Sequence, residues 1–592
     1  MKSAFFPALA LLAPGLLLAQ GPPTMFPPVR GTHEMVGAAN NFEVEAGYRL
    51  LTQGGNAVDA TVAATLAAGV TELSRFGLGG EIPILIKMAG KPVVAISGIG
   101  VAPAKATVDY YTHRAPEPWE DANKMPPVPM QGIKSAITPG VFDGLILALE
   151  QFGTKSFAEV ATPAIEYSEQ GFVMPDEFGK MMQGYHEIMM TWPASAQFFY
   201  PNGVITKRGE VFREPILAKT LRDLVAVEKK THGNRVKKLV AVRDYFYKGS
   251  IARRIADYCE KNGGLIAYED MANFKATVDG SVTGTYRGFE VHKPGFWTQG
   301  PVMVEALNIL EGFDLKSMGH NSPEYLHVVV EAVKLAFADR DQYYGDPRFS
   351  KIPEDTLLSK DYAAERRKLI DPKQASMEHR PGRFGMRIET HTTSQPSNGP
   401  IQDTTSVDVV DRFGNAVSAT PSGAWLPSVI MGDTGIPLTT RLQSFVMTVG
   451  HANQLAPGKR PRVTLSPTLV TQAGKLVMVM STPGGDNQDQ AMLQVLLNII
   501  DFGMTAQEAV EAPRFQTEHF YSSFGNHEFV PGRLMIENRV PKTTIDALNA
   551  LGHRVTVTGA WSNGSAPAII LAHDGVLDGG ADIRRARFIF GR

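Results

Sequence analysis

A polar stretch at residues 371–403 divides the chain into two blocks, and it constrains the fold more than any other feature. The stretch is rich in Pro, Ser, Thr, Gln, Asn and charged residues, a composition typical of an exposed, flexible linker. At Thr404 the pattern changes sharply, because Val407, Val409 and Val410 form a strand-like run that leads into a Gly-Asn turn and a returning strand. Since both blocks contain hairpin patterns and buried helical patterns, the sequence predicts sheets sandwiched between helices.

Local patterns predict the elements of each block. They predict, in chain order, helices over 42–53 and 57–68, strands over 82–88 and 92–97, hairpins over 407–420 and 467–481, and a helix over 488–502. The region from about 135 to 370 is predicted to be mostly helical, and Ser322-Pro323 marks the start of a long helix within it.

Charge and cysteine content exclude several classes of protein. The 592 residues include 58 basic and 60 acidic side chains, for a net charge of −2. This balance gives no basic surface for nucleic acid and no polybasic attraction to a membrane. The single cysteine, Cys259, excludes an internal disulfide and a cysteine-rich metal cluster. The 14 histidines show no metal-binding spacing, so we expect neither a metal nor a cofactor.

The first residues resemble an export signal. Lys2 precedes an apolar run from Ala4 to Ala19 that two prolines interrupt, which predicts a signal peptide over 1–19 with cleavage near Ala19. The alternative is an uncleaved anchor, but the run is short for a membrane span. We therefore expect a periplasmic or secreted protein that has no membrane contact after signal cleavage.

Two segments have the residue types for amide chemistry. Asp403-Thr404-Thr405 lies where the polar stretch meets the strand, and a threonine hydroxyl becomes a nucleophile when an amine, such as its own chain-terminal amine, accepts its proton. Gly484-Gly485 lies between a predicted strand and helix, where backbone N–H groups can stabilise an oxyanion. On spacing alone, a plain strand start is the favoured interpretation of the first segment and a plain turn that of the second.

A series of short segments, in this order, resembles one enzyme family over residues 34 to 590. The segments are Glu45-Ala46-Gly47, Gly54-Gly55-Asn56-Ala57-Val58-Asp59-Ala60, Gly77-Leu78-Gly79-Gly80, Ala102-Pro103-Ala104-Lys105-Ala106-Thr107, Ala338-Asp339-Arg340, Gly345-Asp346-Pro347, Thr404-Thr405, Gly414-Asn415-Ala416-Val417-Ser418, Ser466-Pro467-Thr468, Pro483-Gly484-Gly485 and Ala512-Pro513-Arg514-Phe515. The family that they resemble is the γ-glutamyltransferases, which are N-terminal-nucleophile hydrolases.

The resemblance implies an α+β fold, a four-layer αββα sandwich, made as a precursor that cuts itself before a threonine. The matching bond joins Asp403 to Thr404, so the large subunit would comprise residues 20–403, including the linker at 371–403, and the small subunit 404–592. Both subunits would form one N-terminal-nucleophile domain and stay together as partners. The resemblance says nothing about further oligomerisation.

The resemblance also assigns roles to single residues. Thr404 would be the nucleophile, with its own amine as the base. Gly484 and Gly485 match the family's oxyanion glycines, and Ser422 falls where the family has a second threonine that supports the amine.

The chain departs from the family where the family binds the two ends of a glutamyl group. This chain has Ile99 where the family has an arginine, Ala424 where it has an asparagine, Gln443-Ser444 where it has two aspartates, and Val463-Thr464 where it has two serines. Trp297 lies in a loop that is Pro-rich and Ser-containing in the family. These changes remove the charge partners of a zwitterionic head group. We expect that the amide-cleaving machinery is kept while the acyl specificity is altered, and Arg441, Arg460 and Arg462 are candidates to bind a carboxylate from another direction.

Three rival hypotheses remain open at this stage. The first is a genuine γ-glutamyltransferase or glutathione hydrolase with a rearranged pocket. The second is a non-catalytic binding or scaffold homologue, and the third is an acylase for cyclic-amide or β-lactam side chains. In the enzyme hypotheses the partner is a small amide or peptide substrate.

Overall fold

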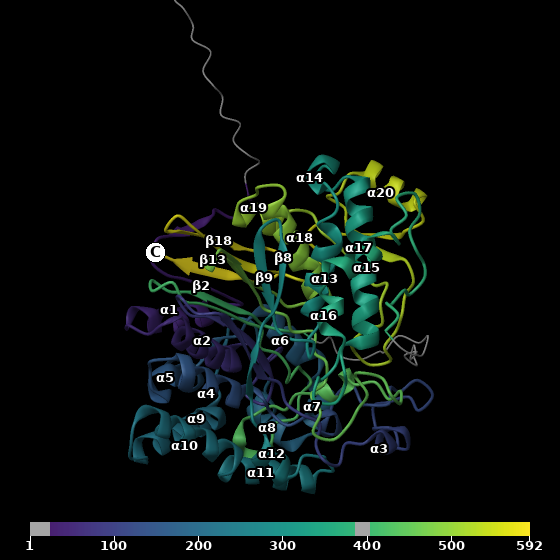
Figure 1. Cartoon of the computed structure of the whole chain (residues 1–592). Coiled ribbons are helices and arrows are strands. Elements are labelled where there is room, and N and C mark those ends of the chain that lie inside the picture. Colours follow the sequence, from purple (N-terminus) through teal and green to yellow (C-terminus); the bar gives the residue numbers. More distant parts are fainter. Residues whose placement is uncertain (1–23, 385–402) are drawn as a thin grey trace, which may run out of the picture.

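Two antiparallel sheets of seven strands lie face to face at the centre of the molecule (Figure 1). The structure is a computed structural model that describes residues 24–384 and 403–592. The predicted signal peptide at 1–19 and most of the predicted linker, residues 385–402, lie outside the described residues. In the described part of the chain, no helix is long and apolar enough to cross a membrane.

Each sheet combines strands from both sides of the Asp403–Thr404 bond. The first sheet has the order β19 (Phe588–Gly591), β2 (Met35–Ala38), β10 (Val407–Val410), β11 (Ala416–Ala419), β3 (Ile82–Lys87), β4 (Val93–Gly98) and β7 (Thr277–Gly280). The second has the order β1 (Val29–Gly31), β18 (Val576–Ala581), β17 (Ala568–His573), β13 (Lys475–Ser481), β12 (Thr468–Gln472), β9 (Phe289–Lys293) and β8 (Val282–Tyr286).

Helices cover the outer face of each sheet, which completes the predicted αββα sandwich (Figure 1). The first sheet contacts α1 (Asn41–Thr52), α2 (Ala57–Thr71) and α4 (Val141–Phe152), and the second contacts α13 (Pro301–Leu310), α18 (Gln488–Ile500) and α19 (Ala506–Glu511). Every residue of α2 is buried, as expected for a helix with small apolar residues on all sides. Asn56 caps this helix in a capping box with Asp59.

Further helices pack outside these layers. The longest is α15 (Pro323–Tyr343), which begins at the predicted Ser322 cap. The others are α3 (Val108–Thr112), α5 (Phe157–Gln170), α6 (Asp176–Gly184), α7 (His186–Met190), α8 (Pro193–Phe199), α9 (Pro215–Lys230), α10 (Arg235–Tyr247), α11 (Ser250–Lys261), α12 (Tyr268–Asn273), α14 (Leu315–Met318), α16 (Glu354–Leu357), α17 (Lys360–Arg367) and α20 (Lys542–Ala550). Small sheets are formed by β5 (Phe172–Val173) with β6 (Val211–Phe212), and by β14 (Phe515–Thr517), β15 (Arg533–Glu537) and β16 (Arg554–Thr558).

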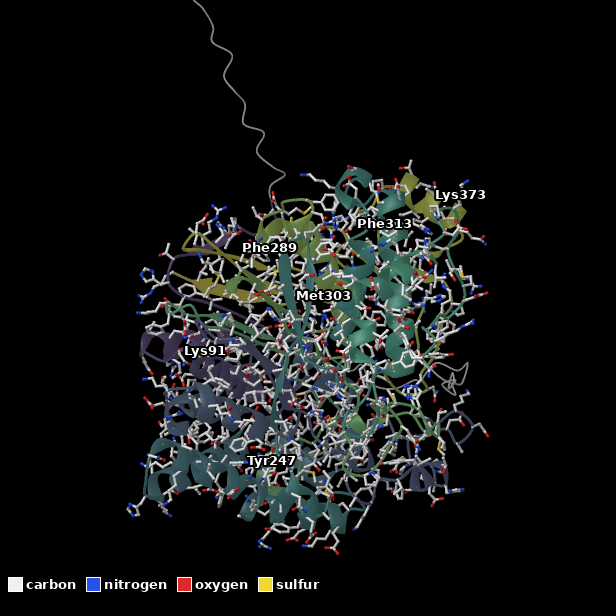
Figure 2. All side chains as sticks on the ribbon, viewed as in Figure 1. Lys91, Tyr247, Phe289, Met303, Phe313 and Lys373 are labelled. Atoms are coloured by element: carbon white, nitrogen blue, oxygen red, sulfur yellow. The ribbon has the colours of Figure 1, made fainter. Side chains whose placement is uncertain are left out.

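The hydrophobic core is divided by the sheets. Met35, Leu85, Leu469, Val479 and Ile570 belong to a cluster made by residues of both sheets, and it fills the space between them. A larger cluster joins the first sheet to its helices, and a second one joins the second sheet to its helices. Figure 2 shows one residue of each, Tyr247 in the lower helices and Met303 near the middle of the molecule.

The local predictions agree with most of these elements, with one clear difference. The region from 135 to 370, which we predicted to be mostly helical, also contains β7, β8 and β9. The chain passes from the first sheet to the second between Gly280 and Val282, where β7 and β8 are edge strands. Most residues of β7 are exposed and polar or Gly, so this strand lacks the apolar run by which strands are predicted.

Candidate active site

Thr404 lies buried where the two blocks of the chain meet. It precedes β10, pairs with Ser422 in an antiparallel bridge, and is only 2% exposed. Its Oγ1 lies 3.2 Å from Ser422 Oγ and 3.5 Å from Nε2 of Gln488, the first residue of α18. The structure thus places the predicted nucleophile beside the predicted supporting hydroxyl and at the start of a helix.

The backbone carbonyl of Asp403 accepts two hydrogen bonds from side chains. Ser422 Oγ donates to this oxygen at 2.9 Å, and the indole Nε1–H of Trp425 donates to the same oxygen. This carbonyl belongs to the bond before Thr404. It is therefore already held by the kind of donors that stabilise an oxyanion.

The Asp403 carboxylate is buried and charged. It accepts the Thr404 backbone N–H at 2.9 Å, and forms ion pairs with Arg75, at 2.7 Å, and with Arg585. Burial alone would raise its pKa, but Arg585 and Arg75 outweigh burial and lower the pKa of Asp403. The last residue of the predicted linker is therefore fixed in the interior rather than exposed.

A buried arginine lies behind Ser422. Arg441 Nη2 donates to Ser422 Oγ at 3.1 Å, and Arg441 Nε donates to Glu81 at 2.6 Å. Its guanidinium stacks 4.4 Å from the ring centre of Trp425 and 5.7 Å from that of Phe524. Burial lowers the pKa of Arg441 and raises the pKa of Glu81, each against the attraction of the other.

Gly484 and Gly485 form the turn between β13 and α18. Both have positive φ, 122° and 55°, a conformation that favours glycine. A Cβ at Gly484 would lie 2.1 Å from Ser565 Oγ, and one at Gly485 would lie 3.3 Å from the Phe524 ring. The sharp turn therefore requires glycine at position 484, and it precedes a helix N-terminus that favours negative charge.

Three residues from the predicted specificity region form one apolar cluster. Ile99, Trp297 and Val463 pack together with Leu465, and each is at most 2% exposed. The Val463 backbone N–H donates to the Trp297 carbonyl at 3.1 Å. Gln299, two residues after Trp297, donates to the Gly485 carbonyl at 3.2 Å. This hydrogen bond links the cluster to the turn that holds Gly484 and Gly485, the predicted oxyanion glycines.

The other predicted specificity residues are also buried. Ala424 lies between Ser422 and Trp425 in the chain and has a positive φ of 59°. Ser444 Oγ and Thr464 Oγ1 have no hydrogen-bond partner among the residues that the structure describes. In the described part of the chain, neither hydroxyl forms a hydrogen bond with Thr404.

The three arginines that we considered as carboxylate partners already have partners in the fold. Arg441 pairs with Glu81, Arg460 pairs with Asp346 at 3.1 Å, and Arg462 donates to Ser523 at 3.0 Å. One guanidinium nitrogen, Nη1, of Arg441 and of Arg462 is buried without a partner among the described residues.

Sequence reasoning missed several residues of this site. Trp425, Gln488, Glu81, Arg75 and Arg585 all contact Thr404, Ser422, Asp403 or Arg441, and no local pattern marks them. The one available signal was the nearness of Trp425 to Ser422 in the sequence.

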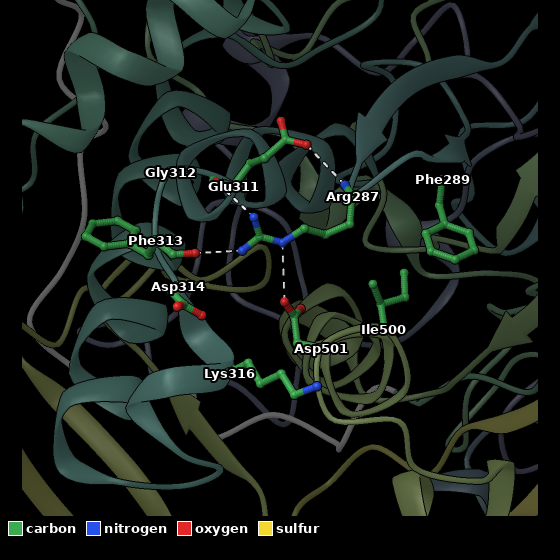
Figure 3. Close-up of a pocket in the computed structure, with 9 residues that line it drawn as sticks. All are labelled: Arg287, Phe289, Glu311, Gly312, Phe313, Asp314, Lys316, Ile500 and Asp501. Carbon is green, nitrogen blue, oxygen red and sulfur yellow. Dashed lines mark hydrogen bonds and ion pairs between the residues drawn. The ribbon is translucent and has the colours of Figure 1, made fainter.

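A separate hollow of about 540 Å³ lies at the turn between β8 and β9 (Figure 3). None of the predicted site residues lines it. The Arg287 guanidinium reaches across it to the carbonyls of Glu311 and Phe313 and to the carboxylate of Asp501, at 3.1, 2.6 and 3.3 Å. The Arg287 guanidinium and these three acceptors satisfy one another.

The fold and the site together define a class of protein. The four-layer αββα sandwich is the fold of the N-terminal-nucleophile amidohydrolases, and Thr404 lies just before β10 of the first sheet. Comparison with known proteins agrees, because the family model described as Gamma-glutamyltranspeptidase matches residues 44–591. The chain belongs to the gamma-glutamyltranspeptidase family and is an enzyme.

Relatives in this family differ in the acyl groups that their names imply. The chain is 34% identical over 576 residues to the glutathione hydrolase proenzyme of Escherichia coli (strain K12), covering 95% of this chain and 92% of that protein. It is 33% identical over 557 residues to the acylase ACY 1 proenzyme of Pseudomonas sp. (strain SE83), covering 94% and 92%. Both relatives are named as proenzymes, which agrees with a precursor that yields two subunits.

Solved structures show the same fold. The structure of LmbA2991HD matches with a TM-score of 0.89 at 34% identity, covering 96% of this chain and 100% of that chain. Cephalosporin acylase from Bacillus halodurans matches with a TM-score of 0.81 at 26% identity, covering 98% and 99%.

Proposed function

We propose that the protein is a self-processing amidohydrolase that cuts its own chain between Asp403 and Thr404 and then uses Thr404 as its nucleophile. One observation supports this proposal most strongly. The Thr404 hydroxyl and the carbonyl of the preceding bond share the same partner, Ser422, at 3.2 and 2.9 Å. A nucleophile and its target carbonyl are thus held on one hydrogen-bonding group.

After the cut, the same threonine would act on substrates. The new α-amine of Thr404, with a pKa near about 8, accepts the hydroxyl proton at neutral pH. Oγ1 then attacks the substrate amide, and the Gly484–Gly485 turn stabilises the oxyanion. The amine of the substrate leaves, and water releases the acyl group from Thr404. We propose that Ser422 orients the amine, because it is the side chain that contacts Thr404 from the neighbouring strand end.

We propose that the acyl group is apolar rather than a free-ended γ-glutamyl group. Ile99, Trp297 and Val463 form a buried apolar cluster next to the oxyanion turn. A zwitterionic head group would lose its hydration against these side chains, none of which carries a charge to pair with it, at a cost of several kcal/mol. The similarity to cephalosporin acylase is compatible with an acylase activity of this kind.

Glutathione hydrolysis is the second candidate, and one feature favours it. The buried guanidinium nitrogens of Arg441 and Arg462 that lack partners in the described part of the chain would suit a substrate carboxylate. The 34% identity to a glutathione hydrolase proenzyme points the same way.

The decisive experiment is intact mass under denaturing conditions for the wild type and for Thr404→Ala. We expect two chains with a junction at Asp403/Thr404 in the wild type and one uncut chain in the variant. The cut protein is then assayed for release of amine from a panel of acyl amides that includes glutathione. An uncut wild-type chain would favour the scaffold hypothesis, and rapid release of glutamate would favour the second candidate. The predicted signal peptide leads us to propose export to the periplasm or the medium.

A further inference from the structure

The backbone carbonyl before Thr404 has a donor that the family resemblance did not assign. This oxygen, on Asp403, accepts hydrogen bonds from Ser422 Oγ and from the indole N–H of Trp425. We propose that Trp425 is a catalytic residue of self-cleavage, which stabilises the oxyanion that forms on this carbonyl. The proposal rests on the proposed cut between Asp403 and Thr404.

Only one arrangement of the hydroxyl protons of Ser422 and Thr404 is consistent with the hydrogen bonds around Ser422. Arg441 can only donate, so its contact of 3.1 Å occupies a lone pair of Ser422 Oγ. The Asp403 carbonyl can only accept, so the single hydroxyl proton of Ser422 points to it. The remaining lone pair of Ser422 faces Thr404 Oγ1 at 3.2 Å, and Thr404 therefore donates to it.

The arrangement supplies a balanced first step. Thr404 Oγ1 bonds to the Asp403 carbonyl carbon while the hydroxyl proton passes to Ser422. The π-electron pair moves to the carbonyl oxygen, and the proton of Ser422 shifts towards that oxygen. Ser422 has then used its donor, so the N–H of Trp425 is the second group that stabilises the developing negative charge.

The remaining steps need only water. The electron pair on the oxygen re-forms the C=O bond, and the proton of Ser422 that had shifted towards this oxygen returns to Ser422. The C–N bond breaks at the same time, and its electron pair stays on the Thr404 nitrogen, which takes up the proton that left the hydroxyl. The product is an ester between Asp403 and Thr404 Oγ1. Water adds to the ester carbon, the C–O bond breaks, and Thr404 regains its hydroxyl while Asp403 becomes a carboxylic acid.

Local structure fixes the indole of Trp425 in this position. Gly423 and Ala424 both have positive φ, 85° and 59°, and alanine rarely adopts this conformation. A Cβ at Gly423 would lie 2.5 Å from Thr439 Oγ1, so a residue with a side chain does not fit at this position unless its surroundings move. The indole that follows is 3% exposed and meets the Phe524 ring edge-on at 6.0 Å.

The charge of Arg441 would strengthen the proposed donor. Its guanidinium lies 4.4 Å from the centre of the Trp425 ring. A cation against the face of an indole withdraws electron density and makes the N–H a better donor. The same arginine also orients Ser422, so both donors to the carbonyl depend on one buried charge.

The test removes the N–H and keeps the shape of the side chain. Trp425→3-benzothienylalanine replaces the N–H with sulfur, and Trp425→Phe is the simpler variant. Precursor made by cell-free synthesis is followed over time by intact mass. We expect the rate of cutting to fall about 100-fold, the loss that follows removal of one oxyanion donor.

Two controls make the result specific. Trp119→Phe removes an indole N–H that is buried without a partner in the described part of the chain, so we expect normal cutting. The double variant Thr404→Ala with Trp425→Phe stays uncut, and its thermal unfolding against Thr404→Ala alone measures any loss of fold. Cutting of the benzothienyl variant at the wild-type rate would overturn the role of Trp425. That result would leave the proposed nucleophile intact, which cutting in Thr404→Ala or an uncut wild-type chain would refute.

Discussion

At the scale of single residues, the site around Thr404 is made of buried charges in pairs. Arg75 pairs with Glu72 and Asp403, and Arg441 pairs with Glu81, with the arginine and glutamate of the second pair fully buried. Removing one member of such a pair leaves a charge without compensation, at a cost of about 3–5 kcal/mol. We therefore regard these arginines as structural supports of the site, and this is why the tests above change Trp425 and Thr404 rather than Arg441.

A second buried acid, Asp408, gives a prediction about pH. It lies between the two sheets and accepts hydrogen bonds from Ser418 at 2.7 Å and Ser481 at 2.6 Å. Burial raises its pKa to about 7, against these hydrogen bonds. The folded state therefore binds a proton that the unfolded state, with a pKa near about 4, has released. As pH rises from about 4 to 7, this residue contributes progressively less stability.

We expect Asp408→Asn to remove this pH dependence. The amide resembles the protonated acid, so the stability advantage of the variant over the parent should grow by on the order of 2–3 kcal/mol between pH 5 and pH 8. Thermal unfolding of both proteins in a Thr404→Ala background between pH 5 and 8 measures the difference. Asp574→Asn, in the exposed turn between β17 and β18, is the control. Equal responses of all three proteins to pH would contradict the prediction.

At the scale of elements, the turn from β13 to α18 is the part of the site that depends most on backbone conformation. Gly484 has a φ of 122° and no room for a Cβ beside Ser565. Gly474, in the turn between β12 and β13, also has positive φ, 76°, but has open space around it. Alanine substitutions at these two glycines form a matched pair. Both introduce backbone strain, but only the substitution at Gly484 also introduces a steric clash.

We expect Gly484→Ala to reduce amide hydrolysis by about 100-fold or more, because the turn must move and carry its N–H groups away from the oxyanion. Gly474→Ala should cost only about 1 kcal/mol of stability and leave hydrolysis unchanged. The measurement is hydrolysis of an acyl amide that the wild type cleaves, with thermal unfolding alongside. Similar losses of activity in both variants would show that strain alone explains the effect.

The elements also show what the sequence could predict. Helix α2, strands β10 to β13 and the glycine turn have local signals, so their places follow from apolar spacing and turn residues. The contact between Arg441 and Glu81 spans 360 positions in the chain. No local pattern marks such a pair, and the contact depends on the pairing of β3 with β11, which continues as a bridge between Glu81 and Ser422. The resemblance to a family supplied Ser422, whereas Trp425 required the fold.

At the scale of the whole molecule, both sheets interleave the two predicted subunits. In the first sheet β2 lies between β19 and β10, which come from the other side of the Asp403–Thr404 bond. In the second sheet β13 and β12 of the small subunit continue into β9 and β8 of the large one. Neither subunit contains a complete sheet, so neither can bury its core alone.

We expect the cut protein to remain one particle under native conditions. The ladders of hydrogen bonds and the shared core between the sheets hold the two chains together, and no linker is needed. Gel filtration of the cut protein at decreasing concentration should give a constant elution volume, while the two chains separate in guanidinium. Release of a free 404–592 chain on dilution would contradict this expectation.

The burial of the Asp403–Thr404 bond has a consequence for how such a protein is activated in a cell. These two residues are 5% and 2% exposed, and the groups around them come from segments hundreds of positions apart. A passing protease cannot reach this bond in the folded state, and an unfolded chain does not assemble the groups that would cut it. Activation would therefore depend on correct folding. Only a molecule that has reached its native structure becomes an active enzyme, and misfolded copies remain inactive.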